Sequence, residues 1–208
     1  MNWQAVFFDF DGVIIDSVDV KTQAFATMFR SYGPDVERAV VNYHLSNGGV
    51  SRFEKFEYYY KHILKKPISQ QIMDELGREF NQLAYDGVLA APFMDGALDA
   101  LNQLKQEKVP AFVVSGTPQE ELQHIVAQKN IGEYFLEVHG SPRKKDDIVK
   151  DLSNRYAINL EDCLFIGDAT TDYIAAKNCA AKFLGIVKKT GKSPFPNGTP
   201  ISPIITFD

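Results

Sequence analysis

Residues 6–17 read VFFDFDGVIIDS, an apolar run that ends in two carboxylates just before a glycine. Its first residues are continuously apolar, which is typical of a strand buried on both faces. Asp9 and Asp11 then stand at the carboxyl end of this strand, where carboxylates are costly unless something compensates them. The stretch therefore predicts a site that contains a metal, a cation or a reaction centre.

Further short apolar runs follow in the second half of the chain, each ending in a polar or glycine-containing turn. They cover residues 110–116, 133–140, 163–168 and 181–187. Segments with helical spacing separate them, so strands and helices alternate. This alternation predicts an α/β fold with a doubly wound, Rossmann-like parallel sheet. We expect the Pro- and Gly-rich tail to be a surface loop closed by a short final strand or extended segment.

Residues 16–90 break this rhythm, because their segments are helical in character and no convincing strand interrupts them. A helical insertion after the first strand is the simplest explanation. We therefore expect a Rossmann-like core formed by residues 1–15 and 91–208, and an inserted α-helical domain formed by residues 16–90. A length of 208 residues accommodates such a core with a modest insertion.

The composition is that of an ordinary soluble globular protein, with 45% hydrophobic and 24% charged residues. Acidic residues outnumber basic ones, 27 to 22, which argues against nucleic acid as a partner. No apolar run approaches the roughly 18 residues that cross a bilayer, and no secretion signal is evident, so we expect a cytoplasmic protein without a membrane partner. Cys163 and Cys179 are expected to be free, buried thiols.

Polar residues follow the ends of several predicted strands. Ligands of open α/β sheets bind beyond the carboxyl ends of the strands, so these residues form the candidate site. They are Asp9, Asp11, Ser115, Gly116, Lys144, Lys145, Gly167, Asp168 and Asp172. Carboxylates at close range cannot all stay ionised without a cation. A hard divalent ion resolves that conflict, and Mg²⁺ fits best if substrate phosphate and waters complete its octahedron.

Stretches at these strand ends resemble, in order, the motifs of the haloacid dehalogenase superfamily, whose phosphotransferases use an aspartate nucleophile. They are DFDGVIIDS (9–17), VVSGT (113–117), GSPRKKDDI (140–148) and GDATTD (167–172). Each lies in the structural context that such motifs require. The resemblance points to the branch of beta-phosphoglucomutase and phosphoglycolate phosphatase.

The resemblance implies a catalytic role for each matching residue. Asp9 is the implied nucleophile, which attacks phosphorus and forms an aspartyl-phosphate. Asp11 is the implied general acid for the leaving oxygen and then the general base for the attacking water. Ser115 is expected to hydrogen-bond the transferring phosphoryl group, and Lys145 to pair with Asp9 and the phosphate.

The resemblance also implies the metal ligands. Asp168 is expected to bind Mg²⁺ together with the Asp9 carboxylate and the Asp11 backbone carbonyl, with Asp172 in a supporting role. The alternative is that Asp168 and Asp172 only cap the helix that begins near Thr170.

Other polar residues near the motifs have less specific interpretations. Lys144 competes with Lys145 for the role of phosphate-binding lysine, and the spacing after Gly-Ser-Pro favours Lys145. Lys144 and Gly116 are kept as candidates for contact with substrate. Asp16 and Ser17 are expected to cap the first helix.

The helical insertion resembles the first type of cap in this superfamily, a lid that expels water and encloses a small substrate. Within it, Gly49, Ser51 and Arg52 resemble a Gly-x-Ser-Arg element in which the arginine contacts an anionic or polar substrate group. The alternative is that Ser51 caps a helix and Arg52 is solvated, and both interpretations stay open. His44 is weighed as a further site residue without being assigned.

We therefore expect a phosphatase, a phosphoric monoester hydrolase that acts on a small phosphorylated metabolite as a monomer or homodimer. A sugar phosphate is favoured, on the resemblance of the cap alone. The alternative is a phosphosugar mutase. Two departures weaken it: Lys21 stands where the mutase pattern has a histidine, and the chain after Ser115 lacks the Lys-Asn pair that binds a second phosphate.

A third hypothesis is a catalytically silent binding or regulatory protein, because fold alone does not fix function. Retention of the complete set Asp9, Asp11, Lys145 and Asp168 argues against it.

Overall fold

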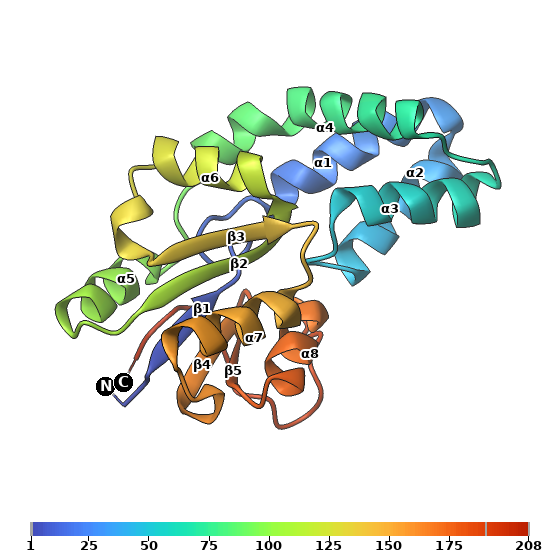
Figure 1. Cartoon of the computed structure of the whole chain (residues 1–208). Helices are drawn as coiled ribbons and strands as arrows, with labels where there is room; N and C mark the ends of the chain where they lie inside the picture. Colours follow the sequence, from blue (N-terminus) through green and yellow to red (C-terminus); the bar gives the residue numbers. More distant parts are fainter. Residues whose placement is uncertain (1, 190, 208) are drawn as a thin grey trace.

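The computed structural model describes residues 2–189 and 191–207, which contain a parallel six-stranded sheet with helices on both faces (Figure 1). The strands are β1 (Ala5–Phe8), β2 (Ala111–Pro118), β3 (Glu137–Ser141), β4 (Cys163–Gly167), β5 (Lys182–Ile186) and β6 (Ile201–Ser202). Their order across the sheet is β3-β2-β1-β4-β5-β6, and every neighbouring pair is parallel. The predicted α/β fold is confirmed.

The helices fall into two groups along the chain. The first group lies within residues 16–90, here called the helical segment, and comprises α1 (Val18–Phe29), η1 (Arg30–Tyr32), α2 (Pro34–Ser46), α3 (Arg52–Tyr58), the π-helical η2 (Tyr59–Leu64) and α4 (Gln70–Ala90). The second group connects the strands and comprises α5 (Ala97–Gln106), α6 (Gln119–Gln128), η3 (Gly132–Tyr134), α7 (Lys145–Tyr156), η4 (Leu160–Asp162) and α8 (Thr170–Asn178). In Figure 1 the helices α1 to α4 gather beyond one end of the strands.

Alternate residues of the central strand pack on opposite faces of the sheet. Val6 and Phe8 of β1 belong to a buried cluster that includes residues of α5 and α6. Ala5 and Phe7 belong to a second cluster, which includes residues of α7 and α8. Side chains of a strand alternate with a period of two, so helices on both faces bury every residue. This burial explains why the strands read as continuous apolar runs rather than alternating ones.

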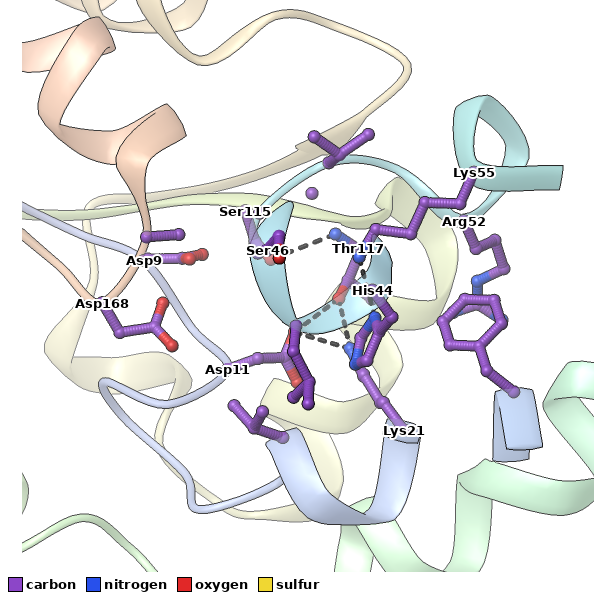
Figure 2. Close-up of a pocket in the computed structure, with 18 of the residues that line it drawn as sticks. Asp9, Asp11, Lys21, His44, Ser46, Arg52, Lys55, Ser115, Thr117 and Asp168 are labelled. Carbon is purple, nitrogen blue, oxygen red and sulfur yellow. Dashed lines mark hydrogen bonds and ion pairs between the residues drawn. The ribbon is translucent and has the colours of Figure 1, made fainter. Parts of the chain in front are cut away.

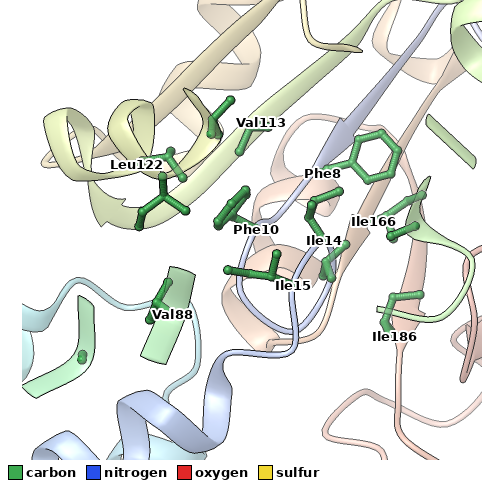
Figure 3. Close-up of a cluster of buried hydrophobic side chains, with 14 of the residues drawn as sticks. Phe8, Phe10, Ile14, Ile15, Val88, Val113, Leu122, Ile166 and Ile186 are labelled. Atoms are coloured by element: carbon green, nitrogen blue, oxygen red, sulfur yellow. The ribbon is translucent and has the colours of Figure 1, made fainter. Parts of the chain in front are cut away.

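The larger cluster reaches from the sheet into the helical segment. Phe10, Ile14 and Ile15, in the turn that follows β1, are fully buried with Phe8. Val88 near the end of α4 belongs to the same cluster (Figure 3). The turn after β1 is therefore held by apolar packing, and this fixes where its two aspartates lie.

The structure corrects two details of the expected elements. The strand expected at 133–140 begins only at Glu137, because the residues before it form η3. Helix α2 covers a stretch that the sequence does not single out, although Pro34 at its first position favours a helix start. The expected final strand is the two-residue β6, which pairs with β5.

The cysteines are unpaired, as expected. Cys163 and Cys179 are buried free thiols, and burial raises the pKa of each to about 11. No helix in the described ranges is both long and apolar enough to cross a membrane.

Candidate active site

Predicted site residues from neighbouring strands meet at the carboxyl edge of the sheet (Figure 2). Asp9 and Asp11 follow β1, Ser115 and Gly116 lie in β2, and Asp168 follows β4. Strand β1 lies between β2 and β4, so these three strand ends are adjacent. Together with side chains of the helical segment, the five residues line a cavity of about 160 Å³.

Asp9 and Asp172 share the ammonium group of Lys145. Its Nζ lies 2.9 Å from Asp9 Oδ2 and donates to Asp172 Oδ1 at 2.6 Å. All three side chains are buried, and Lys145 is the first residue of α7. Asp172 Oδ2 also accepts from the Ala169 N–H at 3.0 Å, so Asp172 both positions the lysine and caps α8.

Carboxylates outnumber the cation at this point. Asp9, Asp168 and Asp172 each offer an oxygen within 4.8 Å of the others. Burial, reinforced by the charge of Asp172, raises the pKa of Asp9 to about 7. Burial and the charge of Asp9 raise the pKa of Asp168 well above its usual range. A buried set of oxygen donors with excess negative charge fits a hard divalent cation, which stabilises the ionised carboxylates.

Two motif glycines allow these carboxylates to lie against the backbone. Gly12 has a φ of +75°, and a Cβ at this position would overlap the Asp168 carboxylate. A Cβ on Gly167 would overlap the side chain of Asp172. Glycine is therefore required at both positions by close approach, and at Gly12 also by its backbone conformation.

Asp11 faces the helical segment rather than the other carboxylates. It accepts hydrogen bonds from Ser17 Oγ at 2.5 Å, Lys21 Nζ at 2.6 Å and Thr117 Oγ1 at 2.8 Å. Burial alone would raise the pKa of Asp11, but the charge and hydrogen bond of Lys21, with the two hydroxyls, hold it at about 2. Asp11 is thus ionised in this arrangement.

The prediction that the side chains of Asp16 and Ser17 cap the first helix is wrong. Ser17 occupies the N-cap position of α1 but forms no side-chain capping bond, because its hydroxyl donates to Asp11. Asp16 pairs with Lys188, whose Nζ lies 2.9 Å from Asp16 Oδ1.

Ser115 and Lys144 have different surroundings. Ser115 is buried, and its Oγ accepts from the Thr117 N–H at 3.1 Å. Lys144 is exposed at the N-terminus of α7 and does not join Lys145 at the carboxylates. The structure therefore brings Ser115 to the cavity and leaves Lys144 outside it.

A glycine loop of the helical segment lies directly on the strand ends. A Cβ on Gly116 of β2 would overlap the carbonyl oxygen of Gly49. Thr171 Oγ1 of α8 donates to the Gly48 carbonyl at 2.9 Å. The helical segment is therefore closed over the carboxyl edge of the sheet in this structure.

Arg52 is neither solvated nor free to contact a ligand with its whole guanidinium. One nitrogen lies 2.5 Å from Glu121 Oε1 and another donates to Asn81 Oδ1 at 2.9 Å. The guanidinium carbon lies 4.3 Å from the centre of the Phe80 ring. Ser51 does cap α3, since its Oγ accepts from the backbone N–H at position 53. Arg52 thus joins the helical segment to α6 while it lines the cavity.

Several side chains that line the cavity were not predicted from the sequence, among them Lys21, Lys55 and Thr117. Thr117 lies within the VVSGT stretch, and its place two residues after Ser115 on the same strand is a usable signal. Lys21 appears in the sequence only as a departure from the mutase pattern. Lys55 carries no signal, because a lysine in an amphipathic helix normally faces solvent.

The model of the haloacid dehalogenase-like hydrolases matches residues 3–180. The chain belongs to this family. Among curated relatives, phosphoglycolate phosphatase 1 of Pseudomonas aeruginosa is 27% identical, covering 86% of this chain and 69% of its own length. The 6-phosphogluconate phosphatase of Escherichia coli is 24% identical, covering 80% of this chain and 74% of its own length. The predicted superfamily and the predicted enzyme class, a phosphatase, are confirmed.

Solved structures share the fold of this family member. The beta-phosphoglucomutase of Clostridium difficile has a TM-score of 0.74 at 18% identity, covering 91% of this chain and 86% of that one. CbbY of Rhodobacter sphaeroides, in complex with xylulose-(1,5)bisphosphate, has a TM-score of 0.75 at 14% identity, covering 97% and 94%. At such identities the likeness establishes the fold alone.

Proposed function

We propose that this phosphatase hydrolyses a small phosphorylated metabolite through an aspartyl-phosphate on Asp9, with Mg²⁺ as its cofactor. The observation that carries the proposal is the buried Asp9 carboxylate, which lines the cavity with Lys145 Nζ 2.9 Å from its Oδ2. A carboxylate needs such a cation beside it if it is to approach an anionic phosphate without strong repulsion.

In the first step Asp9 attacks phosphorus, and the bond from phosphorus to the leaving oxygen breaks. Asp11 donates a proton to that oxygen, so the product leaves as an alcohol. Lys145 and the Ser115 hydroxyl stabilise the charge on the transferring phosphoryl group. The acid role requires a proton on Asp11, so its contact with Lys21 must loosen as substrate enters. Lys21 belongs to α1 of the helical segment, so movement of that segment supplies the release.

In the second step a water attacks the phosphorus of the aspartyl-phosphate and releases Asp9 and inorganic phosphate. Asp11 accepts the proton of that water as general base. The closed arrangement supplies the ionised Asp11 with which this step begins, because Lys21 and Thr117 stabilise its carboxylate. The contact with Lys21 must loosen as Asp11 accepts the proton, since a carboxylate with a pKa of about 2 is a weak base.

The residues that would hold Mg²⁺ are Asp9, Asp168 and the backbone carbonyl of Asp11, with Asp172 in support. When bound, the ion offsets the negative charge of the carboxylates and of the phosphoryl oxygens. The pKa values of Asp9 and Asp168 are raised because their ionised forms are unfavourable without a cation.

We further propose that residues 16–90 act as a cap on a core formed by residues 1–15 and 91–208. The closed loop at Gly48 and Gly49 and a cavity of about 160 Å³ favour a compact substrate. Phosphoglycolate and 6-phosphogluconate, which appear in the names of relatives, are both small phosphorylated carboxylic acids. The preference for a sugar phosphate rests on the resemblance of the cap alone. Arg52, the residue of that resemblance that would contact the substrate, is engaged by Glu121 and Asn81, so the preference stays a prediction.

The test is phosphate release from a panel of small acid, sugar and nucleotide phosphates, with and without Mg²⁺, using Asp9→Asn as the control protein. We expect metal-dependent release that Asp9→Asn abolishes. Conversion of hexose 1-phosphates to 6-phosphates without phosphate release would contradict the proposal and favour a mutase. Release that persists in Asp9→Asn would remove Asp9 as the nucleophile.

A further inference from the structure

The cations that line the cavity differ in one respect. Lys21 pairs with Asp11, and Arg52 pairs with Glu121. Lys55 also lines the cavity and is only 3% exposed, but no carboxylate among residues 2–189 and 191–207 lies within ion-pair distance of it. A buried ammonium group without a counter-ion is costly, so its position calls for an anion that the protein itself does not supply.

The contact that orients Lys55 is with a neutral group. Its Nζ lies 2.9 Å from Nδ1 of His44, which is buried and also lines the cavity. Burial, with the charge of Lys55, holds the pKa of His44 at about 3, so the imidazole is uncharged and Nδ1 accepts from the ammonium. Nδ1 of His44 is the one side-chain hydrogen-bond partner of the Lys55 ammonium in the described part of the chain. An ammonium group has three N–H donors, so Lys55 has donor capacity that the protein leaves unused.

The electrostatic surroundings of Lys55 agree with this interpretation. Burial, then the charge of Lys21, lowers the pKa of Lys55 to about 7, and the more distant Asp11 and Asp168 only partly oppose them. An anion bound directly to the ammonium would reverse that shift.

We propose that Lys55, oriented by His44, binds a carboxylate of the substrate, so the substrate is a small phosphorylated hydroxy acid. The inference rests on the proposed function, because it takes the phosphate to lie at Asp9. In Figure 2 Lys55 and His44 lie across the pocket from Asp9 and Asp168, which places the two anionic groups of one molecule at opposite ends.

A carboxylate fits better than a second phosphate. Lys55 is the one uncompensated cation that lines the cavity within the described ranges, and a carboxylate carries one matching charge, whereas a phosphate carries nearly two. The cavity of about 160 Å³ also favours the smaller, planar group. A site with an unpaired buried donor rejects analogues that lack the acceptor, because the donor is then left desolvated.

The experiment compares esters that differ at one group: phosphoglycolate against ethyl phosphate, and 3-phosphoglycerate against glycerol 3-phosphate. The readout is the ratio of kcat/KM within each pair. We expect the intact enzyme to favour the carboxylate ester of at least one pair by roughly 10- to 100-fold, as charge-assisted hydrogen bonds do. Lys55→Met should bring that ratio close to one, and Lys55→Arg should retain part of it. The matched control is Lys61→Met, an exposed lysine in the adjoining η2, which should leave the ratio unchanged.

A second readout separates this inference from the proposed function. Calorimetric binding of the same esters to Asp9→Asn in Mg²⁺ buffer needs no turnover. Tighter binding of the carboxylate ester to Asp9→Asn, lost in the Asp9→Asn, Lys55→Met double variant, supports the inference. If the intact enzyme hydrolyses no ester, that result overturns only the proposed function. Equal binding within both pairs, or a preference that survives Lys55→Met, overturns the inference. Lys55→Met should fold, since it removes a buried charge that has no counter-ion and keeps a side chain of similar length.

Discussion

The ammonium group of Lys21 lies 2.6 Å from the Asp11 carboxylate and also donates to Thr117 Oγ1 at 2.9 Å. Lys21 of α1 therefore binds Asp11, the proposed acid and base of the reaction, together with the Thr117 hydroxyl of β2. The position of the helical segment and the protonation state of Asp11 are therefore linked, since separation of α1 from β2 removes the cation that keeps Asp11 ionised.

Replacement of Lys21 by Met should lower the free energy of unfolding in a pH-dependent way. The pKa of Asp11 is about 2 in the folded protein against an ordinary value of 3.8, so its contribution is fully present above the ordinary value and is lost as pH falls through about 2. We expect Lys21→Met to cost on the order of 1 to 2 kcal/mol near about pH 6 and less near about pH 3, as measured by urea unfolding. Lys21→Arg, which keeps the charge, should lose less. An equal loss at both pH values would show that Lys21 acts through packing instead.

Replacement of Asp9 by Asn should stabilise the metal-free protein while it abolishes turnover. Asp9 is 2% exposed, and its folded pKa of about 7 lies above the ordinary 3.8. Its stabilising contribution is therefore present below the ordinary value and lost as pH rises through about 7, where ionisation opposes folding. We expect Asp9→Asn to unfold at higher urea than the unaltered chain near about pH 8, by on the order of 2 kcal/mol, and to show little gain near about pH 4.

The measurement is made in chelator, and its control is the same pair of proteins in Mg²⁺. There the unaltered chain should recover most of the difference, because a bound cation removes the repulsion. A metal-free Asp9→Asn protein that is less stable near about pH 8 would show that the Lys145 contact outweighs the repulsion among the carboxylates.

The parts of the site that the sequence predicts are those held by the sheet. Asp9 and Asp168 follow buried strands, and the order of a parallel sheet brings such strand ends together whatever the details of packing. The same rule covers Ser115. For Lys145 the motif spacing favours it over Lys144, and the structure brings Lys145 to Asp9.

The contacts of the helical segment could not be predicted in this way. Arg52 and Glu121 are 69 positions apart in the chain, and their pairing depends on how a whole group of helices sits on the core. Ser17 has the sequence character of an N-cap, and only the tertiary structure offers its hydroxyl the better acceptor, Asp11. Lys55 is buried because it lies on the side of α3 that faces the cavity, and the local periodicity of the sequence does not show which side that is.

Replacement of Gly116 by Ala tests the closed contact between the helical segment and β2. The added Cβ would overlap the Gly49 carbonyl, so the loop must move away from the cavity. We expect kcat/KM for the best phosphate ester to fall by at least about tenfold, since small misplacements at a closed site are costly. The matched control is Gly132→Ala, where the nearest atom to the new Cβ lies at an ordinary 3.8 Å. Unchanged activity of Gly116→Ala would mean that catalysis does not need this contact.

The last prediction concerns the Arg52–Glu121 pair, which joins the helical segment to α6. Both side chains are largely buried, so removal of one leaves the other charge without its partner. We expect Arg52→Ala and Glu121→Ala each to lower the free energy of unfolding by roughly 3 kcal/mol, and the double variant to lose clearly less than the sum. Urea unfolding of the four proteins gives the coupling energy. Arg38→Ala is the control, because its pair with Asp35 is exposed and should contribute less than about 1 kcal/mol.

The same variants separate a structural arginine from one that recognises substrate. If Arg52 serves to join the helical segment to α6, Arg52→Ala and Glu121→Ala should weaken turnover of the preferred ester and of p-nitrophenyl phosphate to a similar extent. If instead Arg52 binds the substrate, Arg52→Ala alone should weaken the preferred ester more than the aryl ester, with little coupling to Glu121. The structure favours the first outcome, because Glu121 and Asn81 already accept hydrogen bonds from the guanidinium of Arg52. The second outcome requires that guanidinium to be available to the substrate.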